Sequence, residues 1–122
     1  MKYLAIALCF CAGGATAEQT NCDTTMVQQE MNICADQSFQ ASDAELNDAY
    51  AEAVKFAREI GGEAEDKLRV AQRAWVTFRD AACDAQAYLN EGGSMQPMVY
   101  SYCLARLTDV RRVDLIQFAA QY

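Results

Sequence analysis

Residues 68–89 read LRVAQRAWVTFRDAACDAQAYL, and this stretch decides the fold class. Its apolar residues recur at alternating steps of three and four, a spacing that places them on one face of an α-helix. The residues of this face are Leu68, Ala71, Trp75, Phe78, Ala82, Ala85 and Leu89. The acidic side chains between 63 and 66 suit the first helical turn, because the helix dipole is positive there. We therefore predict a helix that ends near Asn90 and contributes Trp75 and Phe78 to the core.

Turn signals follow this helix and predict another one. Gly92-Gly93-Ser94 interrupts the apolar pattern, and such a run typically ends a helix. Pro97 suits the first turn of a further helix, because proline lacks only an N–H that would be unpaired there. Apolar residues at helical spacing then continue to Phe118. We predict a last helix over this segment.

Turn signals before residue 68 predict two more helices. Gly61-Gly62 ends the nearer one, which opens on the capping-box pattern Ser42-Asp43-Ala44-Glu45. An earlier helix follows Cys22, with Thr24 or Thr25 as its cap and Gln28 as the capping partner. No window shows the alternation of a strand. The chain is therefore predicted to be all-α, a small antiparallel bundle of about four helices.

The N-terminus has the features of a secretory signal peptide. Lys2 is followed by an apolar run over residues 3–12, and Ala15-Thr16-Ala17 presents the small residues that precede a cleavage site. The run is about half of the roughly 20 residues that span a bilayer. We predict cleavage of residues 1–17 and a single mature domain over 18–122, located in the periplasm or secreted.

Four of the six cysteines belong to this mature domain, and in an exported chain they predict two disulfides. Cys83 and Cys103 come level in an antiparallel hairpin, so a bridge between them is geometrically natural. Cys22 and Cys34 would lie roughly 15–18 Å apart if the chain were helical from Thr25 onward. Either the first helix starts late or bends back, or both early cysteines pair with the later ones.

The residue types present exclude most catalytic chemistry. The sequence contains no histidine, which removes Ser-His-Asp and Cys-His nucleophiles and most catalytic zinc sites. No phosphate-binding glycine loop or dinucleotide motif is present. Carboxylate pairs such as Asp80 and Asp84 are ordinary on a solvated helix face. We predict a protein with no catalytic residues, no metal site and no cofactor, and therefore not an enzyme.

Charge is distributed unevenly along the chain. Residues 23–66 contain eleven acidic residues against Lys55 and Arg58, whereas residues 67–122 carry a small positive excess. An acidic surface of this kind is unsuited to nucleic acid or to an anionic membrane. It would attract a basic partner and accelerate encounter at low salt.

Several sequence elements together resemble the LprI-type lysozyme-inhibitor family. The resemblance begins with the run Ala71-Gln72-Arg73-Ala74-Trp75, then Phe78-Arg79-Asp80 and Cys83, and covers residues 22–116. It implies a small exported helical domain that contains the four cysteines. The family-motif residues, which we interpret as mainly structural, are Leu46, Asn47, Tyr50, Gln72, Trp75, Arg79, Asp80, Thr108 and Arg111.

The resemblance and the charge distribution together predict a binding function. The resemblance implies an inhibitor of a basic glycan-cleaving enzyme such as lysozyme, whose cleft the acidic helices would occlude. The residues predicted to contact this partner are Asp43, Glu45, Asp48, Glu52 and Ser94. The alternative is a non-inhibitory structural or adaptor module of the cell envelope, which binds another envelope protein.

Overall fold

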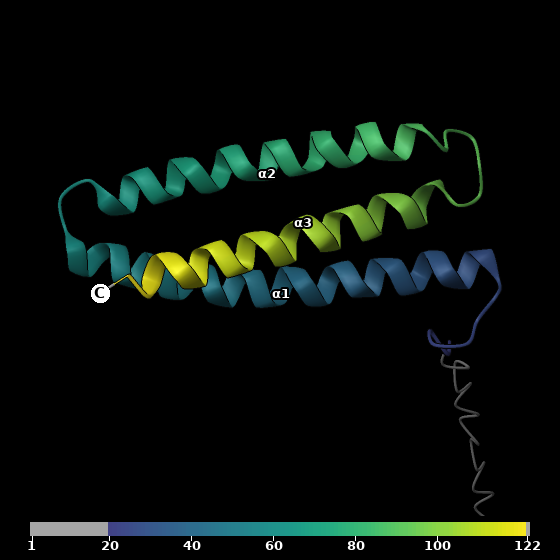
Figure 1. Ribbon diagram of the computed structural model, residues 1–122, viewed down its shortest axis with the longest axis horizontal. Helices are drawn as coiled ribbons and strands as arrows, with labels where there is room; N and C mark the ends of the chain where they lie inside the picture. Colours follow the sequence, from purple (N-terminus) through teal and green to yellow (C-terminus); the bar gives the residue numbers. More distant parts are fainter. Residues whose placement is uncertain (1–19, 122) are drawn as a thin grey trace, which may run out of the picture.

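The computed structural model describes residues 20–121, so the predicted signal peptide at 1–17 lies outside the described residues. Within them the chain forms three α-helices and no strand: α1 (Gln28–Ile60), α2 (Ala64–Tyr88) and α3 (Gln96–Ala119). Figure 1 shows α1 running from right to left, α2 from left to right and α3 from right to left, so that α1 and α3 point the same way. The all-α prediction is confirmed, but the helices number three rather than about four. None of the described helices is both long and apolar enough to cross a membrane.

The difference in helix number arises at Ser42, where a helix start was predicted. Here α1 continues without a break over 33 residues, and the Ser42 side chain is buried at 8 % exposure. No glycine or proline interrupts this part of the chain, and the inward face passes steadily from Ala35 through Phe39 and Ser42 to Leu46. Packing of this face outweighs the local preference of serine for a cap.

The start of α1 also differs from the prediction. The N-cap residue is Val27, not Thr24 or Thr25. The hydroxyl of Thr25 instead accepts a hydrogen bond from the Val27 N–H and donates one to the Glu30 carboxylate. A turn in which Thr24 and Thr25 donate their backbone N–H groups to the Asn21 carbonyl carries the chain back beside the helix.

This late start resolves the distance problem at the first pair of cysteines. Because the segment before α1 turns back, the Cα atoms of Cys22 and Cys34 lie 5.6 Å apart and the two residues form a disulfide. Cys83 and Cys103 form the second disulfide, with Cα atoms 5.5 Å apart. The chain therefore contains the predicted two bridges. Both lie at the end of the bundle where α1 begins, the right-hand end of Figure 1.

The two interhelical turns lie at the predicted positions. Gly61 and Gly62 have φ angles of 80° and 58°, in the left-handed region that residues with a Cβ rarely adopt, and α2 begins two residues later. Gly92 has a φ of 75° in the second turn, and Pro97 lies in the first turn of α3. These turns reverse the chain twice and make successive helices antiparallel.

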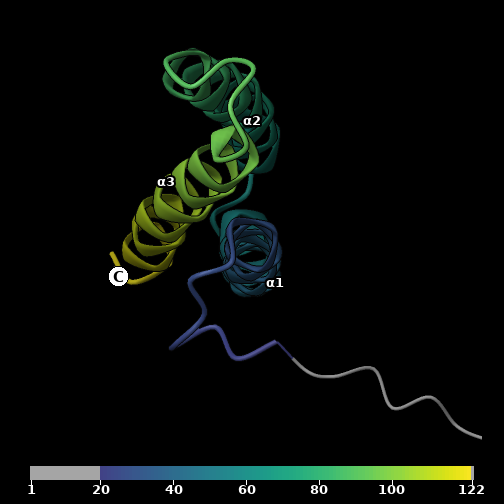
Figure 2. The same cartoon turned by 90° about the vertical axis from the view of Figure 1, so that its right-hand side faces the viewer.

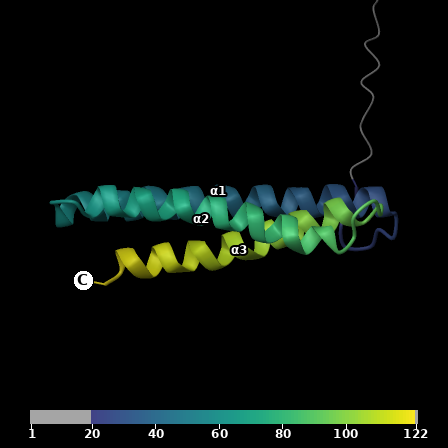
Figure 3. The same cartoon turned by 90° about the horizontal axis from the view of Figure 1, so that it is seen from above.

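The core lies mainly between α1 and α3. Small side chains on α1, including the fully buried Ala53 and Ala57, allow α3 to approach closely and to bury Leu115. A second cluster surrounds the buried disulfide of Cys83 and Cys103. Figure 2 shows the helices nearly end-on, and Figure 3 shows α3 lying at an angle to the other two and diverging toward its C-terminus.

The buried face of α2 is rotated from the predicted one. Phe78, predicted to lie in the core, is 60 % exposed, and Leu89 is 84 % exposed. The inward side chains are instead Leu68, Gln72, Trp75, Arg79 and Cys83. The apolar stripe read from the sequence is displaced because its neighbour Arg79, and not Phe78, points inward.

Candidate partner-binding groove

Three acidic residues of α1 share one face of the helix. Glu45, Asp48 and Glu52 follow one another at steps of three and four, which places them in a row along the helix. They border a groove of about 530 Å³ between α1 and the C-terminal half of α3. The groove lies beside the C-terminal half of α3. Figure 3 shows that this half of α3 diverges from α1. Its other lining residues are Ala49, Arg112, Ile116, Ala119 and Ala120.

The three carboxylates differ in how far they are already neutralised. Arg112 places Nε 3.3 Å from Glu45 Oε2, so this acid has a counter-charge across the groove. Lys55 lies 3.9 Å from Glu52, but both side chains are largely exposed and such a pair is weak. Asp48 forms no ion pair or side-chain hydrogen bond with any residue between 20 and 121. The groove therefore has an apolar floor, one unpaired carboxylate and one weakly paired carboxylate.

The structure does not bring all five predicted partner contacts to this groove. Asp43 lies two residues from Glu45, about 200° around the helix, and its Oδ1 is 3.6 Å from Arg79 Nη1. Ser94 lies in the turn between α2 and α3, and its carbonyl accepts a hydrogen bond of 3.0 Å from Asn32 Nδ2. Asn32 precedes Glu45 by thirteen residues, or about 20 Å of helix. The predicted acidic surface thus reduces to Glu45, Asp48 and Glu52.

Arg79 is the centre of a cluster that joins all three helices. Its guanidinium carbon lies 5.2 Å from the ring centroids of both Phe39 and Trp75, so the cation is held between two aromatic faces. Arg79 Nε donates a hydrogen bond of 2.9 Å to Asp80, and Nη1 approaches Asp43 and the buried hydroxyl of Thr108. We call these residues the Arg79 cluster. Within this cluster, Arg79 and Asp80 take part in contacts that hold the helices together.

Other motif residues lie beside this cluster. Arg111 Nε donates a hydrogen bond of 3.0 Å to Gln72 Oε1 and so links α3 to α2. Asn47 Nδ2 donates to Asp43 Oδ2 at 3.3 Å, so Asn47 contacts Arg79 only through that acid. Leu46 is buried in the main core, and Tyr50 packs against it. None of these side chains lines the groove between α1 and α3.

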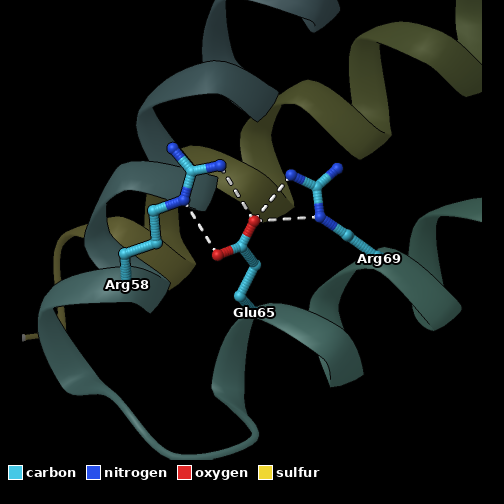
Figure 4. Close-up of polar contacts among 3 residues, drawn as sticks. All are labelled: Arg58, Glu65 and Arg69. Atoms are coloured by element: carbon cyan, nitrogen blue, oxygen red, sulfur yellow. Dashed lines mark hydrogen bonds and ion pairs between the residues drawn. The ribbon is translucent and has the colours of Figure 1, made fainter.

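A separate ionic contact closes the turn between α1 and α2. Figure 4 shows Glu65 between Arg58 and Arg69. Arg58 Nε and Nη2 donate hydrogen bonds of 2.8 and 3.0 Å to its two oxygens, and Arg69 Nη2 donates one of 2.6 Å. These hydrogen bonds, chiefly that from Arg58, lower the pKa of Glu65 from 4.5 to about 2. Glu65 therefore remains ionised in mild acid and holds the beginning of α2 against the end of α1.

Between residues 20 and 121, no three Cys, Asp or Glu side chains are grouped so that they could hold a metal ion. Asp80 forms an ion pair with Arg79. Burial raises the pKa of Tyr100, and the charges of Asp80 and Asp84 raise it further.

Comparison with known proteins places the chain in a family. The family model described as "Lysozyme inhibitor LprI" matches residues 19–115. The chain belongs to the LprI family. An uncharacterised protein of Rhizobium meliloti (strain 1021) is 40 % identical over 124 residues, covering 92 % of this chain and 88 % of that protein. A solved DUF1311-family protein of Pseudomonas putida KT2440 has a TM-score of 0.71 at 24 % identity, and the match covers 84 % of this chain and all of that one.

The residues that carry the resemblance to the LprI family differ from those that line the groove. The motif that carried the resemblance converges on the Arg79 cluster and the Gln72–Arg111 contact, which join the helices. The groove is built from other residues, and sequence reasoning missed its α3 side. Arg112, Ile116, Ala119 and Ala120 do recur at helical spacing, which was the available signal. Helical spacing alone does not show that this row of α3 faces α1.

Proposed function

We propose that this LprI-family protein is an exported inhibitor of a basic, lysozyme-like glycan-cleaving enzyme, and that it binds the enzyme through the groove between α1 and α3. The family is named for an inhibitor and not for an enzyme. Two disulfides are typical of chains that fold in an oxidising compartment, which supports export to the periplasm or beyond. Inhibition is steric, because a protein bound over an enzyme's cleft excludes the glycan.

One observation supports the groove more than any other. Asp48 has no basic partner between residues 20 and 121, and it lies at the edge of an apolar floor formed by Ala49 and Ile116. A lysine or arginine side chain matches this arrangement, because its aliphatic stem packs on apolar surface while its charged end remains at the rim. The ammonium or guanidinium group would then pair with Asp48 or with the weakly paired Glu52. The groove thus suits a basic side chain that projects from a partner's surface.

Charge beyond the groove supports the same partner. Residues 23–66 carry a net charge of −9, counted from eleven acidic and two basic residues, and this half supplies the α1 side of the groove. A field of this sign raises the encounter rate with a basic protein, and salt screens it over about 8–10 Å. Binding should therefore weaken as the salt concentration rises.

The proposal is tested by titrating the oxidised protein into a lysozyme assay on peptidoglycan at low and at moderate salt. We expect saturable inhibition that weakens with salt. The variant Asp48→Lys/Glu52→Lys should raise the inhibitory concentration by about tenfold or more, since each reversal replaces attraction at the rim with repulsion.

A matched control separates contact from general electrostatics. Asp36→Lys/Asp66→Lys changes the net charge by the same amount at exposed positions outside the groove. This variant should lose clearly less affinity than the groove variant. Equal losses would contradict binding at the groove. An absence of inhibition at every salt concentration would refute the inhibitor function and favour the non-inhibitory envelope module.

A further inference from the structure

Helix α2 exposes a second apolar face, opposite the one that packs on α1 and α3. Val70 is 57 % exposed, Phe78 60 % and Leu89 84 %, and the alanines at 74, 81 and 85 are exposed as well. Exposed single apolar residues are common, but a long row of them usually marks a contact surface. We call this row, which ends at the C-cap residue Leu89, the outer stripe of α2. It consists of Val70, Ala74, Phe78, Ala81, Ala85 and Leu89.

The spacing of the outer stripe makes it continuous. Its members follow at steps of four, four, three, four and four, so they lie within one side of the helix. The stripe extends over about 28 Å at 1.5 Å per residue. Figure 2 shows α2 at the edge of the bundle, with α1 and α3 both to one side of it. Within residues 20–121, nothing covers the stripe.

The spacing of the stripe is the same when it is read in either direction, and its outer members match in size. Its first and last members are large (Val70 and Leu89), and the next from each end are alanines. The central pair, Phe78 and Ala81, is one large and one small residue. When two copies of α2 lie antiparallel about the midpoint of the stripe, Phe78 of each copy faces Ala81 of the other. The ring of Phe78 then packs on the small side chain of Ala81. This contact occurs twice, as an interface with two-fold symmetry requires.

Charges beside the stripe fit the same antiparallel pairing. Arg73 and Asp84 are eleven residues apart, which is about three helical turns, so they flank the stripe on one side. Neither forms an ion pair with another residue between 20 and 121. In the antiparallel pairing, Arg73 of one copy lies opposite residue 86 of the other. Residue 86 is two residues from Asp84, so Arg73 and Asp84 are offset by about 3 Å along the helix axis. The pairing therefore creates two equivalent ion pairs between the copies.

From this pattern we propose that the chain forms a two-fold dimer in which the outer stripes of α2 pack against each other antiparallel. The contact is about 28 Å long and one helix wide, which places it among small interfaces, so the dimer is reversible. The groove between α1 and α3 contains no residue of α2. Each dimer therefore presents two open grooves, and dimer formation and partner binding are independent.

Sedimentation analysis of the oxidised chain over a range of concentrations tests the proposal. The mass should approach that of two chains at high concentration and fall to that of one on dilution. Phe78→Glu places a charge at the centre of the contact and should weaken association by about tenfold or more. Val110→Glu is the matched control, because Val110 is 56 % exposed on α3 and lies outside the stripe. It should leave the mass unchanged.

A charge exchange tests the antiparallel register without disturbing the core. Arg73→Glu places a glutamate near Asp84 of the other copy and should weaken the dimer. The double variant Arg73→Glu/Asp84→Arg restores opposite charges and should restore association. A single-chain mass at every concentration would overturn the proposal, as would equal weakening by Val110→Glu. Failure of the double variant to recover association would overturn the antiparallel pairing.

Discussion

Replacement of Arg79 should reveal how strongly the Arg79 cluster holds the three helices together. The side chain is only 11 % exposed and lies between the rings of Phe39 and Trp75. A cation–π contact contributes about 0.5–1 kcal/mol at exposed sites and about 2 kcal/mol when desolvated, so two partly buried contacts contribute about 2 kcal/mol. The carboxylates of Asp43 and Asp80 are 41 % and 47 % exposed, which limits each ion pair to less than about 1 kcal/mol.

Thr108 adds a further cost when Arg79 is removed. Its hydroxyl is fully buried, and loss of a buried partner costs about 1 kcal/mol or more. We therefore expect Arg79→Ala to lower the free energy of unfolding by about 3–4 kcal/mol. Arg79→Lys keeps the positive charge but loses the planar group that stacks on the two rings, and it should cost about 2 kcal/mol.

Urea unfolding of the oxidised chain, followed by circular dichroism, measures these losses. Arg106→Ala is the matched control, because Arg106 is exposed on α3 and forms no ion pair with any described residue. It should change stability by less than about 0.5 kcal/mol. If Arg79→Lys were as stable as the unaltered chain, the stacking between Phe39 and Trp75 would not be the source of the stability, and the reasoning would be refuted.

Two further predictions concern the acid limit and the disulfides. Because the pKa of Glu65 is lowered from 4.5 to about 2, its ion pairs stabilise the fold above pH 4.5 and are lost as the pH falls toward 2. Glu65→Gln should therefore reduce the loss of stability between pH 4.5 and pH 2, measured as the free energy of unfolding against pH. An unchanged curve would contradict the role of Glu65 in these ion pairs. Removal of the Cys83–Cys103 bridge by paired alanine substitution should cost about 3 kcal/mol from loop entropy plus a packing loss, because both residues are buried. The Cys22–Cys34 bridge closes a shorter loop and involves an exposed residue, so its removal should cost less; equal midpoints in thermal unfolding would show that burial of the second bridge contributes nothing.

The parts of the fold predicted from sequence are those with strong local causes. Gly61-Gly62 readily adopts the positive φ angles that end a helix, and Pro97 fixes its own φ, so the turns they mark were found. Ser42 was misread because a serine three residues before a glutamate looks the same in a cap as in a helix interior. Only the buried row from Ala35 to Leu46 distinguishes the two cases, and that burial depends on α3.

The same limit explains the misplaced face of α2. Periodicity favours Phe78 over Arg79 as a core residue, because arginine is costly to bury alone. Arg79 becomes an inward residue only when Phe39 and Asp43, about forty residues earlier in the chain, lie against it. Only the α1 side of the candidate groove was predicted from the sequence. Its acidic row follows from spacing within α1, whereas Arg112 and Ile116 join it through the angle at which α3 crosses.

The position of the second disulfide has a mechanical consequence for the groove. Cys103 fixes the beginning of α3 to α2, and no covalent link joins the rest of α3 to the other helices in the described chain. The sixteen residues from there to Ala119 extend over about 24 Å of helix. They are held by non-covalent contacts, among them the buried Leu115 and the packing of Phe118 against Phe56. A tilt of about 5° at Cys103 displaces the end of α3 by about 2 Å. The groove lies along this non-covalently held half of α3, so a small tilt of the helix changes the width of the groove without breaking either disulfide.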